Sequence, residues 1–289
     1  MTTTLGISCF YHDAAAALVR DGEIIAAAQE ERFTRHKFDP SFPTNAIRYC
    51  LEEAGIQAKD LDNVTFYDKP ILTFDRLVNS YFAVAPRGAK SWLTSMPLWI
   101  SQKLHIPDII RSSLQYTGEV IFTPHHIAHA ASAFYPSPYD DAAILTIDGV
   151  GEWATGSYGW GNGTEVRILR EMHFPDSLGL LYSAFTYFCG FKVNSGEYKL
   201  MGLAPYGEPR YLDLLKERVA KIREDGSVTL DLTYFGFLDR LEMTSPRFEQ
   251  LFQGKRRLPE SRITRREMDL AASIQAFTEE AMLKMTNWV

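Results

Sequence analysis

The sequence predicts an α/β protein built from two similar halves. Residues 5–29 have the pattern of a strand, a polar loop, a second strand, a tight turn and a third strand. Residues 142–170 repeat this order of elements, with glycines in the loop. Strands that alternate with helical segments favour an α/β class. We therefore expect a first subdomain over residues 1–140 and a second over residues 141–289.

Composition and charge limit the classes of function. The chain has 289 residues, 46% of them hydrophobic, and a formal net charge of −6, enough for one large domain or two smaller ones. Its mild acidity argues against a nucleic-acid partner. It has neither an apolar run long enough to cross a bilayer nor a basic segment before an apolar one, as in a secretory signal. We therefore expect a cytoplasmic protein without a membrane partner, whose scattered cysteines (Cys9, Cys50 and Cys189) are reduced and buried.

The first half opens with a predicted three-stranded antiparallel unit. Strands are expected over residues 4–9 and 14–19, and Asp21-Gly22 is a strong signal for a hairpin turn into a third strand. His12 lies in the polar loop between the first two strands. Such a loop can face a ligand, although ordinary turn chemistry is the simpler explanation. The later predicted elements are a charged loop at 30–43, a helix at 45–54, strands at 63–67 and 119–122, and a helical insertion at 70–115. This insertion is interpreted as a lid, as an acceptor pocket, or simply as an amphipathic part of the core.

The most informative stretch is residues 123–134, which holds three of the seven histidines. On a helix, His125 and His129 project from one face, one turn apart. Two imidazole nitrogens so placed can bind one metal ion, whereas His126 points elsewhere. An apolar strand then ends in Asp148, whose carboxylate would complete a site of mixed nitrogen and oxygen ligands. A histidine pair at this spacing is also common on surfaces and in cores without a metal.

The second half is predicted to follow the same order. Glycine-rich loops such as the one after Asp148 present backbone N–H groups that suit phosphate. Strands are expected at 142–148, 154–160 and 165–170, with a turn at 161–163, and a buried helix follows at 177–191. The glycine-containing segment at 196–207 is either a site where Lys199 meets a phosphate or a simple loop. A peripheral insertion is expected at 208–265, and a last helix starts near Thr264, with Glu267 completing a capping box.

Several motifs together resemble a known family. They are Tyr-His-Asp-Ala-Ala-Ala-Ala-Leu at 11–18, Glu-Glu-Arg-Phe-Thr-Arg at 30–35 with Lys37, the histidine segment at 125–133, Asp-Gly-Val-Gly-Glu at 148–152, and Lys-Leu-Met-Gly-Leu-Ala-Pro-Tyr-Gly at 199–207. In this order they resemble the O-carbamoyltransferases of antibiotic and nodulation-factor biosynthesis, related to the tRNA threonylcarbamoyl-transfer proteins. The resemblance implies the duplicated, ribonuclease H-like fold of actin, sugar kinases and heat-shock chaperones.

The resemblance also implies a reaction in two steps. Carbamoyl phosphate and ATP, with Mg, give carbamoyl adenylate, and the carbamoyl group then passes to an acceptor hydroxyl on a sugar or another natural product. The second step would belong to the part of the protein seen here, at a bound divalent metal. Iron is the family's metal, while zinc or manganese would suit the same ligands.

The resemblance assigns roles to particular residues. His125, His129 and Asp148 would hold the metal, and Asp148 would thereby be a catalytic residue. His12 would be the general base for the acceptor hydroxyl, since a near-neutral imidazole suits that role. Lys37 would contact the acceptor. The remaining implied contacts are Asp68 with the acceptor, Gly149 and Gly151 with the adenylate, and Gly179, Lys199 and Gly202 on the nucleotide side.

The family continues beyond the length of this chain, so the second half is expected to be incomplete. Missing parts would include another aspartate ligand, a glycine-rich loop and the adenylate-forming domain. We expect that the chain alone does not make carbamoyl adenylate, and that it is an excised domain, a truncated product or half of a split enzyme that needs the other half in cis or in trans. A homodimer is one possible assembly. The alternative functions are a small-molecule kinase, disfavoured because kinases hold magnesium through carboxylates and phosphates, and a non-catalytic binding module.

Overall fold

The computed structural model describes residues 1–289. Their contacts divide the chain into two compact units, residues 1–74 with 95–128, and residues 75–94 with 129–289. This division does not fall at the boundary expected between residues 140 and 141. Helix α6 (His125–Phe134) begins in the first unit and continues into the second.

The first unit contains a mixed sheet of five strands in the order β3-β2-β1-β4-β5. Strand β2 runs antiparallel to β1 and β3, while β1, β4 and β5 are parallel to one another. This order and these directions are those of the ribonuclease H-like fold that the sequence led us to expect. The bounds are β1 (Thr3–Ser8), β2 (Ala15–Arg20), β3 (Glu23–Gln29), β4 (Asn63–Phe66) and β5 (Val120–Phe122).

Local sequence signals explain this sheet and the helix beside it. Asp21 and Gly22 adopt positive φ angles of 49° and 89°, as the predicted two-residue hairpin turn requires. Helix α2 (Thr44–Ala54) buries Cys50 together with Ala46 and Ile47. It ends at Gly55, whose φ of 65° lets its N–H donate to the carbonyls of the last turn. These elements match the predicted ones to within about two residues.

The insertion predicted at residues 70–115 is helical, and the charged loop predicted at residues 30–43 contains one short helix. The helices are α1 (Glu31–Thr34), α3 (Pro70–Val84), α4 (Ala89–Ser101) and α5 (Ile106–Leu114). Residues 75–94 of the insertion belong to the second unit, and the rest belongs to the first. No helix is both long and apolar enough to cross a membrane.

The second unit contains an antiparallel sheet of three strands, β6 (Asp141–Ile147), β7 (Ala154–Asn162) and β8 (Glu165–His173). The turn predicted at residues 161–163 lies slightly later, at residues 163–164, because β7 continues through Asn162. Gly161 serves close packing instead. A Cβ atom there would lie 2.7 Å from the ring of Phe134 on α6.

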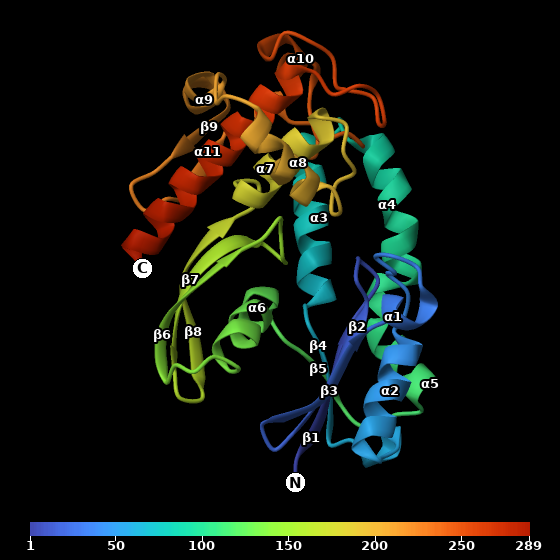
Figure 1. Ribbon diagram of the computed structural model, residues 1–289. Helices are drawn as coiled ribbons and strands as arrows, with labels where there is room; N and C mark the ends of the chain where they lie inside the picture. Colours follow the sequence, from blue (N-terminus) through green and yellow to red (C-terminus); the bar gives the residue numbers. More distant parts are fainter. The chain divides into compact units, whose positions relative to one another are not determined.

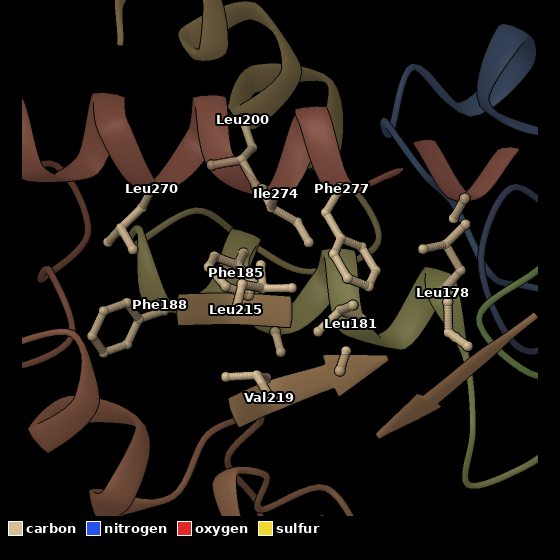
Figure 2. Packing of buried hydrophobic residues seen from close by; sticks show 14 of the residues in the cluster. Leu178, Leu181, Phe185, Phe188, Leu200, Leu215, Val219, Leu270, Ile274 and Phe277 are labelled. Atoms are coloured by element: carbon tan, nitrogen blue, oxygen red, sulfur yellow. The ribbon is translucent and has the colours of Figure 1, made fainter. Parts of the chain in front are cut away.

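The main core of the second unit lies between helices. Helices α7 (Leu178–Phe188), α8 (Glu197–Leu203) and α11 (Arg265–Trp288) surround buried leucine and phenylalanine side chains (Figure 2). The predicted capping box of Thr264 and Glu267 starts α11. The alternative of a simple loop at 196–207 is wrong, because α8 and a 3-10 turn at Ala204–Tyr206 occupy most of that segment.

Residues 208–265 are part of this core rather than peripheral. They contribute the fully buried side chains of Leu215, Val219, Phe248 and Phe252 to the same cluster as α7 and α11. Weak sequence periodicity hid this role, since the segment consists of short elements. These are α9 (Leu212–Leu214), a π-helical turn (Leu215–Val219), β9 (Ala220–Ile222), β10 (Val228–Leu230), a 3-10 turn (Leu232–Tyr234) and α10 (Pro246–Leu251), drawn in orange to red in Figure 1.

Candidate metal centre

Two neighbouring parallel strands set the position of His125. The backbone N–H of Thr123, just after β5, donates to the carbonyl of Phe66 at the end of β4 at 3.0 Å. Tyr67 follows β4, and its ring meets that of His125 edge-on with the centroids 5.4 Å apart. Because the carboxyl ends of parallel strands share one edge of a sheet, His125 begins α6 at the edge where such folds place their ligands.

His129 lies one turn further along α6 and faces Asp148, which follows β6. The Nε2 atom of His129 is 3.7 Å from Oδ2 of Asp148. That distance exceeds a hydrogen bond, but two atoms that each bind one ion at about 2.1 Å lie roughly 3 to 3.5 Å apart. One ligand atom each from His125, His129 and Asp148 lies within 4.8 Å of the others. Since α6 is one continuous helix, both imidazoles stay side by side.

The donor set fits a divalent transition metal. Two imidazole nitrogens and one carboxylate oxygen suit iron, zinc or manganese better than magnesium, which prefers oxygen ligands and water. Only a small approach of the three groups would bring them to bonding distance of one ion. His126, the third histidine of this segment, is buried and is not in this group.

Several hydrogen bonds hold Asp148. Its backbone N–H donates to the carbonyl of Thr155 across the β6–β7 hairpin at 3.0 Å. Its Oδ1 accepts from the N–H of Gly149 at 2.6 Å, so Oδ2 is the oxygen that faces His129. The hydroxyl of Ser177 approaches the carbonyl of Asp148 at 3.3 Å and donates to that of Gly149 at 2.7 Å. The carboxylate is therefore oriented before any metal arrives.

The start of helix α7 packs directly against this loop. Ser177 is the N-cap and accepts from the backbone N–H of Leu180 at 2.9 Å. Gly179 lies in the first turn, where a Cβ atom would be 2.5 Å from the carbonyl oxygen of Asp148. Only glycine permits so close an approach. The structure thus places Gly149 and Gly179 beside the predicted metal ligand.

The amides of the predicted adenylate loop bond within the loop. The N–H of Gly149 donates to Asp148, as above, and that of Gly151 donates to the carbonyl of Ala154 at 2.8 Å. These bonds give the loop its shape. The role of Gly149 and Gly151 in contacting an adenylate stays a prediction.

Helix α8 carries the other two residues predicted for the nucleotide side. It turns Leu200 and Leu203 into the core, and it leaves Lys199 and Gly202 exposed. A Cβ atom at Gly202 would meet no atom within 4 Å. Packing therefore does not require glycine at this position.

The residues predicted for the acceptor and for proton transfer lie in the first unit. His12 is exposed, and its Nδ1 lies 2.9 Å from the carboxylate of Asp13. Its ring lies against that of Tyr11, with the centroids 4.6 Å apart. Lys37 is exposed, with its ammonium 4.8 Å from the ring centroid of Phe38. Asp68 follows the end of β4, as predicted.

Lys103 is a candidate acceptor-binding residue that the sequence did not reveal. Its ammonium lies 4.9 Å from the ring centroid of Trp99 and 5.5 Å from that of Tyr11. Burial lowers the pKa of Lys103, and the negative charge of Asp68 acts in the opposite direction. No motif surrounds this lysine. The only signal was its place in an aromatic-rich insertion for which an acceptor pocket was one interpretation.

Comparison with known proteins places these residues in a family. Residues 3–289 match the family described as "Carbamoyltransferase N-terminus". The chain is 54% identical to the uncharacterized protein sll1178 of Synechocystis sp., over 100% of this chain and 48% of that protein. It is 35% identical to nodulation protein NolNO of Sinorhizobium fredii, over 93% of this chain and 37% of that protein.

A solved structure with similarity is component A of (R)-2-hydroxyglutaryl-CoA dehydratase from Acidaminococcus fermentans. It is 15% identical, with a TM-score of 0.44, over 100% of this chain and 79% of that one. The chain spans about half the length, or less, of the curated relatives named above. The match over nearly the whole chain shows that this protein belongs to the carbamoyltransferase N-terminus family.

Proposed function

We propose that the chain is the transfer domain of an ATP-dependent O-carbamoyltransferase. It would accept carbamoyl adenylate, made from carbamoyl phosphate and ATP elsewhere in the complete enzyme, and pass the carbamoyl group to an alcohol. The observation that carries this proposal is the grouping of His125, His129 and Asp148 in a member of the carbamoyltransferase family. A bound divalent metal would supply positive charge that polarises a carbonyl or holds phosphate oxygens.

The residues of the chain would serve the transfer step as follows. The acceptor oxygen forms a bond to the carbamoyl carbon, and the bond from that carbon to the phosphate oxygen of the adenylate breaks. AMP leaves, and the proton of the acceptor hydroxyl goes to a base. His12 is our candidate for that base, because its Nδ1 interacts with Asp13 while the opposite ring nitrogen can take a proton.

The kinase alternative has less support. The three grouped side chains offer two imidazoles and a single carboxylate, whereas magnesium in phosphotransferases is held by oxygen atoms. Transfer of label from the γ-phosphate of ATP to an alcohol would favour a kinase over the proposed function.

The direct test supplies carbamoyl adenylate to the chain. We would incubate the purified, iron-loaded protein with carbamoyl adenylate and a panel of sugar and other alcohols, and detect carbamoylated product and AMP by mass spectrometry. The double variant His125→Ala, His129→Ala is expected to lose product formation. The matched control is His173→Ala, because His173 lies exposed on β8 and pairs with Glu171. The proposal fails if product forms equally in the double variant and the control.

A further inference from the structure

The second unit contains a cavity of about 460 Å³ that no residue of the metal centre lines. Its walls come from the C-terminal half of α3, from Trp153 in the β6–β7 loop, from Phe174 and Pro175 after β8, and from residues 232–245. This volume lies within the range of pockets that hold small organic molecules.

One wall consists of aromatic side chains that other residues hold in place. The guanidinium of Arg76 lies 5.0 Å from the ring centroid of Phe174. Arg76 is buried, and its Nε donates to the carbonyl of Glu152 at 2.5 Å. The indole N–H of Trp153 donates to Asp75 at 3.4 Å. Because helix α3 fixes both aromatic residues through these contacts, the wall is formed before any ligand binds.

The cavity is also lined by two arginines that share one carboxylate, and we call this part of its lining the charged wall. Arg87 and Arg240 lie 3.8 Å and 3.7 Å from the two carboxylate oxygens of Asp239. Both distances are longer than a direct hydrogen bond, so the guanidinium donors can still bond a ligand. Two positive charges against one negative charge leave a net charge of +1 on this wall. Such a wall attracts an anionic group.

The position of the charged wall is also fixed by packing. Gly88, with a φ of 82°, follows α3, and a Cβ atom there would lie 3.3 Å from the Cα of Asp239. Asp239 itself is only 15% exposed, whereas Arg87 and Arg240 are 74% and 47% exposed. Packing thus holds Asp239 in place, while both guanidinium groups are open to solvent.

We infer that this cavity binds a ring-sized organic anion. The ring contacts Trp153 and Phe174, and the anionic group, a carboxylate, sulfonate or phosphate, binds Arg87 and Arg240. A ring with no charge would leave the guanidinium donors unused. The inference does not depend on the proposed transfer reaction, because it rests on residues outside the metal centre.

The experiment measures binding with two matched probes. The protein is labelled with 5-fluorotryptophan, and the loss of one ¹⁹F resonance in Trp153→Phe identifies Trp153 among the five tryptophans. Naphthalene-2-sulfonate is the anionic probe, and naphthalene-2-methanol is its neutral counterpart. We expect saturable movement of the Trp153 resonance, with tighter binding of the sulfonate.

Variants separate the two parts of the site. The double variant Arg87→Gln, Arg240→Gln is expected to weaken sulfonate binding by about tenfold, equivalent to ~1.4 kcal/mol, with no effect on the neutral probe. Phe174→Leu is expected to weaken both probes. Arg218→Gln is the control, because Arg218 is exposed and contacts only Glu217 among acidic residues. Equal binding of both probes, or unchanged sulfonate binding in the double variant, would overturn the inference.

Discussion

A Cβ atom on Gly179 would lie 2.5 Å from the backbone carbonyl oxygen of Asp148. Helix α7 and the loop that carries the predicted metal ligand are therefore in contact backbone to backbone. The position of either one sets the position of the other. Substitutions in the first turn of α7 should consequently affect the metal centre, although α7 contributes no ligand.

Gly179→Ala tests this contact, and Gly202→Ala is its matched control. The added methyl at Gly179 must displace α7 or the loop, which should lower the free energy of unfolding by about 1–3 kcal/mol and weaken metal binding. At Gly202, a Cβ atom meets no atom within 4 Å, so replacing a helical glycine should stabilise by ~0.5–1 kcal/mol. Urea denaturation and metal titration check both. Equal stability of the two variants would contradict the contact.

Metal should stabilise the folded protein through His125 and His129. A ligand that binds only the folded state, at one hundred times its dissociation constant, adds about 2.7 kcal/mol to the free energy of unfolding. We expect this gain with Fe²⁺, Zn²⁺ or Mn²⁺ in the wild type and in His173→Ala, and its loss in His125→Ala, His129→Ala. Thermal unfolding and elemental analysis after chelator-free purification measure it. A metal-bound double variant would place the metal elsewhere.

The capping box of α11 predicts a dependence of stability on pH. Burial acts to raise the pKa of Glu267, but the hydrogen bonds from Thr264 and Arg266 outweigh it and hold that pKa below the ordinary value. A lowered carboxyl pKa means that this stabilisation is complete above the unfolded-state pKa, about 4.5, and is lost as the pH falls through the folded-state pKa. Acid denaturation followed by circular dichroism should show this loss.

Thr264→Ala should cost about 1 kcal/mol at pH 7 and reduce the acid dependence due to Glu267. Thr286→Ala, at the exposed end of the same helix, is the control. Its hydroxyl bonds only to carbonyls within the helix. If both variants lose the same stability, the capping box has no special role.

The helical core predicts a large difference between two substitutions on α11. Phe277 is fully buried in the cluster around α7 (Figure 2), whereas Leu283 is 63% exposed. Phe277→Ala should therefore lower the free energy of unfolding by about 3–5 kcal/mol, and Leu283→Ala should change it by about 0.5 kcal/mol or less. Chemical denaturation measures both. A small effect at Phe277 would show that the core does not pack as described.

The three cysteines should be unreactive in the folded protein. All are free and buried, and burial raises the pKa of each thiol, that of Cys189 to about 12. Since the thiolate is the reactive form, a disulfide reagent at pH 8 should modify none of them until the chain is unfolded in urea, when it should modify all three. Rapid reaction of one thiol in the native state would refute this.

The sequence predicted elements whose signals are local. The Asp21-Gly22 turn, the end of α2 at Gly55 and the Thr264 capping box each depend on neighbouring residues, and each is confirmed. Helix α8 was harder, because three glycines in residues 196–207 left a loop as an alternative, and the burial of Leu200 against residues distant in the sequence stabilises the helix. Tertiary packing outweighs local propensity in such cases.

The candidate metal centre also combines features that the sequence revealed with features that only the structure shows. The spacing of His125 and His129 on one helix was visible in the sequence, and the structure brings Asp148 to them. The reason for glycine at position 179 was not visible, because it depends on a contact with Asp148, 31 residues earlier in the chain. The roles of His12, Lys37 and Asp68 stay predictions.

The hydroxyl of Ser177 accepts from the N–H of Leu180 in the first turn of α7 and also donates to the carbonyl of Gly149 in the loop after β6. Formation of that helix end and ordering of the loop should therefore occur in one kinetic step during folding. A partly folded chain in which α7 has not docked would hold Asp148 loosely and bind metal weakly. The rate at which refolding protein acquires metal affinity should then report the docking of α7.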